Sequence, residues 1–154
     1  MADVAILYQH EPAIEKTTEQ IITGVEQLGG NIVLKEEFAI NSDQSHNIVA
    51  KVISAKPEVV IVFGWGPTYT AILNDLKQQQ FKGPVITDNN IYSSKKELKE
   101  NGKGIYVFDI LFDPSMKIKS ITDFMQEYNK KSSIEPDTFA IILGETVIFQ
   151  KILS

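Results

Sequence analysis

Few residues in this sequence belong to the types that carry out chemistry. Cysteine is absent, which excludes disulfides, zinc thiolates and thiol catalysis. The two histidines, His10 and His46, lie too far apart for metal-binding spacing, so no metal site and no cofactor are predicted. His10 stands beside Glu11, and these side chains either form a general acid–base pair or lie in a solvated loop. Neither a G-x-S-x-G elbow nor a glycine-rich phosphate-binding motif occurs, so no catalytic residue is assigned.

Two short segments have compositions suited to binding a small molecule. Trp65 stands between Gly64 and Gly66. It is expected either to cover the core or to offer a flat surface on which a ligand stacks. The two glycines would let the backbone approach that ligand closely. Asp88, followed by Asn89, either meets a cation or an ammonium group or forms a plain turn.

These segments follow short apolar runs that are typical of buried parallel strands, because they are rich in Val and Ile and show little alternation. The runs span residues 4–8, 32–38, 59–63, 84–87 and 105–111. Between them, apolar residues recur at helical spacing around residues 14–28, 48–53 and 69–76, and more weakly in 94–100. Pro12 and Pro67 stand where helices should begin. Glycines stand where helices should end, namely Gly29, Gly83 and Gly102.

This alternation predicts an α/β fold: a three-layer sandwich around a five-stranded parallel sheet with the flavodoxin-like strand order 2-1-3-4-5. In such a sheet, ligands bind at the carboxyl ends of the strands, near the point where the strand order reverses. The loops after the first, third and fourth strands would therefore form the site. They comprise residues 9–13, 64–67 and 88–90.

The composition is that of an ordinary globular domain and disfavours two kinds of partner. Hydrophobic residues make up 43% of the chain, and the formal net charge is −5 at pH 7. All 15 basic residues are lysines, so guanidinium groups are lacking and no nucleic-acid partner is predicted. No run approaches the roughly 20 apolar residues of a membrane span. No signal peptide precedes the first strand, so we expect a segment of a larger protein.

Two further helices are predicted after the last strand, so the expected boundaries are residues 1–112 for an α/β lobe and 113–154 for the helices. These helices would span about residues 115–131 and 137–153. The second is apolar around most of its circumference, whereas a surface helix should leave a polar face. It is expected either to be buried centrally or to pack on protein outside this chain. The predicted assembly is a homodimer formed through these helices.

Several stretches occur in an order and at spacings that resemble one family. They are VAILY at 4–8, LGGNIV at 28–33, DQS at 43–45, KVI at 51–53, KPEVV at 56–60 and FKGPVI at 81–86. The pattern continues with Phe124, Tyr128, Pro136, Ala140 and Gly144. Together they resemble the type 1 periplasmic binding proteins of the leucine/isoleucine/valine-binding group, which are the substrate-binding components of ABC importers.

The resemblance implies a solute-binding module, not an enzyme, that holds a small polar ligand such as an amino acid in a cleft between two lobes. This chain would supply the second lobe. A membrane permease of an ABC transporter would be the partner, and the location would be periplasmic or otherwise extracytoplasmic. Two alternatives use the same loops: a stand-alone flavodoxin-like enzyme or regulatory domain, and a ligand-sensing receptor domain.

By position, the ligand contacts of that family fall on Ala13, on Trp65 or Gly66, and on Asn89 with Asp88 beside it. The family has an aromatic residue where Ala13 stands and an acid where Asn89 stands. Because a buried ammonium group needs an acidic partner, an amide, an aromatic acid or another small polar solute is as compatible as a branched-chain amino acid. The candidate ligand-binding residues are therefore His10, Ala13, Gly64, Trp65, Gly66, Asp88 and Asn89.

Overall fold

The computed structural model describes residues 1–108 together with residues 123, 126, 128 and 130. The chain divides into two units, Met1–Asp109 and Ile110–Ser154, and the sheet belongs to the first. Within the helix predicted over 115–131, only residues 123, 126, 128 and 130 are described, and all four are helical. The helix predicted over 137–153 lies outside the described residues, and the homodimer formed through the two helices stays a prediction. Among the described residues, no helix combines the length and the hydropathy that a membrane crossing requires.

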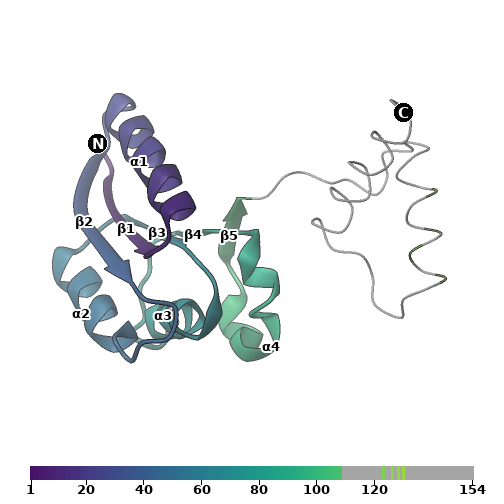
Figure 1. Cartoon of the computed structure of the whole chain (residues 1–154). Coiled ribbons are helices and arrows are strands. Elements are labelled where there is room, and N and C mark those ends of the chain that lie inside the picture. The colour runs from purple at the N-terminus through teal and green to yellow at the C-terminus, as the bar shows by residue number, and fades with distance from the viewer. Residues whose placement is uncertain (109–122, 124–125, 127, 129, 131–154) are drawn as a thin grey trace, which may run out of the picture. The chain divides into compact units, whose positions relative to one another are not determined.

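Five parallel strands form one sheet in the first unit (Figure 1). They are β1 (Asp3–Gln9), β2 (Asn31–Phe38), β3 (Val59–Phe63), β4 (Val85–Asp88) and β5 (Ile105–Phe108). Their order across the sheet is β2-β1-β3-β4-β5. The predicted α/β fold, with its strand order 2-1-3-4-5, is confirmed. The last predicted strand ran to residue 111, and its residues 109–111 lie outside the described part.

Helices connect the strands, as parallel pairing requires. They are α1 (Pro12–Gln27), α2 (Ser45–Ala55), α3 (Gly66–Gln78) and α4 (Lys95–Leu98), with the 3₁₀ helices η1 (Asn89–Tyr92) and η2 (Lys99–Gly102) on either side of α4. Pro12 and Pro67 stand in the first turns of α1 and α3, as predicted. The weak helix predicted over 94–100 is broken, because Lys99 takes a positive φ of 47° that ends α4 after one turn.

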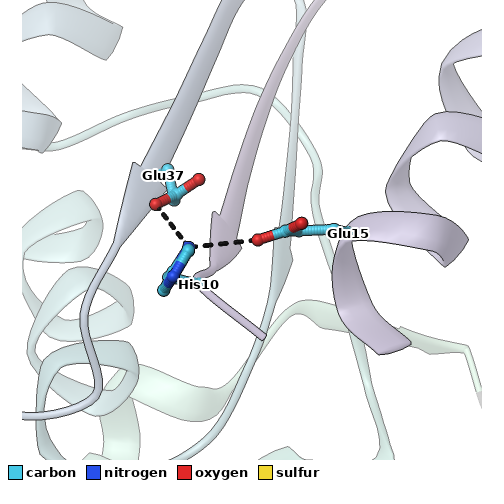
Figure 2. A group of neighbouring side chains, drawn as sticks. All are labelled: His10, Glu15 and Glu37. Carbon is cyan, nitrogen blue, oxygen red and sulfur yellow. Dashed lines mark ion pairs between the residues drawn. The ribbon is translucent and has the colours of Figure 1, made fainter. Parts of the chain in front are cut away.

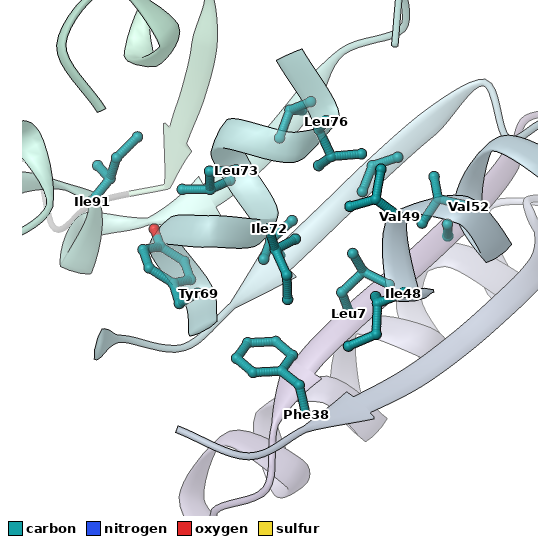
Figure 3. Close-up of a cluster of buried hydrophobic side chains, with 14 of the residues drawn as sticks. Leu7, Phe38, Ile48, Val49, Val52, Tyr69, Ile72, Leu73, Leu76 and Ile91 are labelled. Atoms are coloured by element: carbon teal, nitrogen blue, oxygen red, sulfur yellow. The ribbon is translucent and has the colours of Figure 1, made fainter. Parts of the chain in front are cut away.

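Side chains of β1 alternate between the two faces of the sheet and so divide the core in two. Ala5 and Leu7 point to the face covered by α2 and α3, where the larger cluster of buried side chains lies (Figure 3). Val4 and Ile6 point to the opposite face, where α1 packs. The three predicted layers are therefore α2 with α3, the sheet, and α1.

Of the glycines expected to end helices, Gly29 does so and Gly83 does not. Gly29 follows α1 with a φ of 82°, a conformation that favours glycine. Gly83 does not end α3, because Gln80 already provides the left-handed residue, at a φ of 59°. A Cβ at Gly83 would lie 2.3 Å from the carbonyl oxygen of Glu58. That prediction was wrong for Gly83, whose constraint is close packing rather than helix termination.

Candidate ligand-binding site

The carboxyl ends of β1 and β3 are joined by a side chain that the sequence analysis did not single out. Gln9 is the last residue of β1 and is only 3% exposed. Its Oε1 accepts a hydrogen bond from the backbone N–H of Trp65 at 2.9 Å. The register of the sheet explains the meeting, because Tyr8 pairs with Phe63 and so places Gln9 next to Gly64. The loops after these two strands are thus held together.

Gly64 allows this close approach. Its φ is 152°, and a Cβ there would lie 2.9 Å from Cζ of Phe38 and 3.0 Å from Cβ of Gln9. The first distance is shorter than real Cβ contacts and the second is tight, and the φ is one that favours glycine. Gly66, with a φ of 83°, is constrained in the same way by Ile40, whose Cγ1 would lie 2.8 Å away.

Asp88 connects the carboxyl end of β4 to the same edge. Its Oδ1 accepts the backbone N–H of Asn90 at 3.2 Å, and its Oδ2 accepts the side-chain amide of Asn90 at 3.0 Å. The backbone N–H of Gly64 lies near enough to this carboxyl to favour its charged form. Burial raises the pKa of Asp88, and these hydrogen bonds act in the opposite direction. Asp88 therefore caps η1, as the turn alternative predicted, while its carboxyl group faces the loop after β3.

Trp65 lies half-buried at the N-cap position of α3, with an extended backbone. Next to it, α3 is tied down by Thr68, whose hydroxyl donates to the carbonyl of Ile40 at 3.0 Å and accepts the N–H of Ser42 at 2.7 Å. Gly66 also lines a cavity of about 440 Å³ between α3 and the segment 93–97. The indole is therefore presented from a fixed helix start.

Two further candidate residues, Asn89 and Ala13, lie in different helices. Asn89 is half-buried in η1, directly after Asp88. Ala13 is exposed in the first turn of α1, where its N–H donates to a carboxylate oxygen of Glu11 at 3.0 Å. Glu11 thus caps α1 and does not pair with His10, so the acid–base pair considered for these two residues does not form.

His10 is exposed and turns toward two other glutamates. Its Nδ1 lies 3.0 Å from Glu15 and 2.8 Å from Glu37. Gly64 and Trp65 therefore lie against Gln9, with Asp88 on the neighbouring loop, whereas the contacts of His10 lead to α1 and β2. A signal for Gln9 existed in the sequence, since it directly follows the apolar run 4–8 and begins the loop predicted at this edge.

Three kinds of group meet the requirements of a small-molecule site. Trp65 contributes an aromatic surface, Asp88 a carboxylate and the neighbouring glycines a closely approachable backbone, all at one edge of a rigid sheet. Small-molecule sites combine such an apolar surface with a few fixed polar groups.

Comparison with known proteins gives a consistent picture of the fold. Residues 1–143 match the sequence profile of the family described as periplasmic binding protein. The leucine-binding protein LivK from Thermotoga maritima has a TM-score of 0.81 and 16% identity, over 96% of this chain and 43% of that one. A periplasmic binding protein type 1 from Bordetella pertussis has a TM-score of 0.79 and 14% identity, over 92% of this chain and 41% of that one.

A third similar structure is the branched-chain amino acid transporter substrate-binding protein LivJ from Streptococcus pneumoniae, solved in complex with isoleucine. Its TM-score is 0.73 at 18% identity, over 94% of this chain and 42% of that one. This chain thus spans less than half the length of each of these proteins. A search of curated proteins finds no match.

Proposed function

This chain belongs to the periplasmic binding protein family, and on that premise we propose that it is a solute-binding module without catalytic activity. The observation that carries the proposal is the joining of three loops at the carboxyl edge of the sheet. Gln9 holds the backbone N–H of Trp65, and the backbone N–H of Gly64 lies near the Asp88 carboxyl. An aromatic residue and a carboxylate thereby belong to neighbouring loops at one edge of the sheet.

The chemistry of the edge favours a small polar ligand such as an amino acid or a derivative of one. The Asp88 carboxylate already accepts the backbone N–H and the side-chain amide of Asn90. An ionised carboxyl has about four lone-pair sites, so it can still receive an ammonium or amide group. The half-buried Trp65 would then contact the apolar or planar part of the same ligand.

The other wall of the binding cleft would come from protein outside the described residues. In support, the chain covers 43% of LivK and 42% of LivJ. In the complete protein, the partner would be the membrane permease of an ABC importer, and the module would work on the extracytoplasmic side of the membrane.

Trp65 provides the test, because it is the only tryptophan in the chain. We would titrate the full chain with aliphatic, aromatic and amide-bearing amino acids and follow Trp65 by fluorescence and by the NMR signal of its indole N–H. The expected result is saturable binding that is weaker than micromolar, since only one wall of the cleft is present. Asp88→Asn should weaken the binding of ligands that carry an ammonium group, whereas the exposed Asp43→Asn should leave it unchanged.

Two results would contradict the proposal. One is chemical conversion of the added amino acid, detected by NMR and abolished in His10→Gln, since a binding module leaves its ligand intact. The other is the absence of any change at Trp65 across the whole series at millimolar ligand. Micromolar affinity would instead show that the chain contains a complete site and needs no second wall.

A further inference from the structure

Three side chains that share no motif converge beside the carboxyl ends of β1 and β2 (Figure 2). His10 comes from the loop after β1, Glu15 from the first turn of α1 and Glu37 from β2. The Nδ1 atom of His10 lies 2.8 Å from Oε1 of Glu37 and 3.0 Å from Oε1 of Glu15. One ligand atom from each residue lies within 4.8 Å of the others.

The backbone holds these three residues in place. The N–H of His10 donates to the carbonyl of Phe38 at 2.8 Å, which ties the loop to β2. Glu37 pairs with Tyr8 in the register of β1 and β2. Glu15 belongs to the first turn of α1, where its N–H donates to the Glu11 carbonyl at 2.9 Å. The donor atoms are therefore gathered by the fold.

Hydrogen bonding within the cluster cannot satisfy both glutamate carboxylates. Nδ1 of an imidazole carries at most one hydrogen, but two carboxylate oxygens approach this atom. The neighbouring Lys35 is engaged elsewhere, because it forms an ion pair with Glu19. Two negative groups therefore face a single imidazole, a pattern in which one cation would satisfy both carboxylates.

A partner outside the cluster orients one of the carboxylates. The Tyr8 hydroxyl donates to Oε2 of Glu37 at 3.4 Å, on the oxygen that does not face His10. A tyrosine hydroxyl is protonated at neutral pH and therefore acts as the donor in this contact. Carboxylates that bind metals are commonly held by such a second hydrogen bond.

We propose that His10, Glu15 and Glu37 bind a divalent transition-metal ion of the Zn²⁺ class. Zinc binds imidazole nitrogen and carboxylate oxygen at about 2.0–2.2 Å, so its tetrahedral ligand atoms lie about 3.3 Å apart. The nitrogen–oxygen separations of 2.8 and 3.0 Å need only a small expansion to reach this value. An imidazole in the donor set favours zinc over Mg²⁺ or Ca²⁺, which prefer oxygen ligands. A fourth position would remain for water or an exogenous ligand.

This site is separate from the proposed ligand contacts, which lie on Trp65 and Asp88. The metal proposal therefore does not rest on the solute-binding proposal, and the variants that test it leave Trp65 and Asp88 intact. Sequence spacing gives no hint of the site, because its residues come from three elements joined only by the strand register.

Isothermal titration of the full chain with Zn²⁺ at neutral pH tests the proposal. The expected result is one ion per chain, with affinity reduced at least about tenfold in Glu15→Gln and in Glu37→Gln and more in His10→Gln. The glutamine variants keep the size of the side chain, and circular dichroism checks that each variant folds. His46→Gln is the matched control, because His46 faces a single carboxylate, that of Asp75 at 3.4 Å, and its loss should leave the affinity unchanged.

Two further readouts distinguish a built site from a negatively charged surface. Co²⁺ in place of zinc should give visible absorption bands that disappear in His10→Gln, and the ring protons of His10 should shift on adding Zn²⁺. The proposal is overturned if Zn²⁺ does not saturate at one ion per chain, if His10→Gln binds as wild type does, or if Mg²⁺ competes equally.

Discussion

Oε1 of Gln9 lies 2.9 Å from the backbone nitrogen of Trp65, although the two residues stand 56 positions apart in the sequence. The bond joins the end of β1 to the start of α3 and does so with a buried side chain. A buried amide is costly unless it is hydrogen-bonded. This contact therefore stabilises the fold and at the same time sets the position of the half-buried indole.

Replacing Gln9 by leucine should destabilise the protein. The change keeps a side chain of similar length but removes the acceptor of the Trp65 N–H, and leaving a buried donor unpaired costs about 1–3 kcal/mol. Urea denaturation would measure the free energy of unfolding. Gln20→Leu, at an exposed position of α1, is the control and should change it by less than about 0.5 kcal/mol. Equal stability of the two variants would show that the bond has no energetic role.

The buried hydrogen bond between Tyr69 and Thr87 predicts that mutations of its two partners destabilise the protein to different degrees. Thr87 Oγ1 donates its only hydrogen to the carbonyl of Val62 at 2.7 Å, so Tyr69 must be the donor in its own 2.7 Å bond to Thr87. Tyr69→Phe removes one bond and should cost about 1 kcal/mol. Thr87→Val leaves the buried Tyr69 hydroxyl without an acceptor and should cost more, up to about 3 kcal/mol.

Urea denaturation of both single variants and the double variant would test this asymmetry. Once Thr87 is replaced by valine, the buried Tyr69 hydroxyl has no acceptor and destabilises the protein. Removing that hydroxyl in the double variant should recover part of the loss, so the double variant should be less destabilised than the sum of the single variants. Strict additivity, or a larger loss in Tyr69→Phe than in Thr87→Val, would contradict the assigned direction of the bonds.

The carboxyl of Asp88 should make stability fall as pH rises. Burial raises its pKa above the ordinary value of 3.8, so the folded state binds this proton more tightly than the unfolded chain does. The resulting stabilisation is fully present below the unfolded pKa and is lost as the pH rises through the folded pKa. Asp88→Asn removes this loss and keeps a good capping residue for η1.

Denaturation curves of wild type and Asp88→Asn, taken from about pH 3.5 to about pH 7, would test this linkage. The variant should gain stability relative to wild type as the pH rises. Asp43→Asn changes an exposed carboxyl and serves as the control for the loss of one negative charge. A relative gain for Asp88→Asn at the acidic end would reverse the sign and contradict the prediction.

Two glycines should respond to alanine in opposite directions. Gly24 lies inside α1, and a Cβ there meets no atom within 4 Å, so Gly24→Ala should stabilise the protein by about 0.5–1 kcal/mol. A Cβ at Gly83 would approach the Glu58 carbonyl oxygen to 2.3 Å, so Gly83→Ala should lower the melting temperature. Differential scanning calorimetry would compare them, and a shift in the same direction for both would count against the packing described at Gly83.

The fold was predictable because its signals are local. Most of the strands are short apolar runs, although β2 carries charged residues at 35–37. Pro12 and Pro67 mark the first turns of their helices. The prediction was poorest for residues 94–100, where a left-handed Lys99 divides the segment into short helical pieces. No pattern of apolar residues reveals such a backbone conformation.

The site was predictable only in part, since side-chain partners depend on register. The carboxyl ends of parallel strands share an edge, so the loops containing Trp65 and Asp88 could be identified. The partner of His10 could not, because the adjacent Glu11 turns to the start of α1 while Glu37 arrives through its pairing with Tyr8. The role of Gln9 likewise depends on a residue 56 positions away.

The place of β1 in the sheet has a consequence for biosynthesis. Residues 3–9 precede both of their neighbours in the chain, yet they pair with β2 on one edge and with β3 on the other. While the ribosome has not yet released residues 59–63, one edge of this apolar strand has no partner. An open apolar edge invites pairing with other chains. During the interval between the emergence of β2 and that of β3, this edge of β1 is therefore open to pairing with another chain.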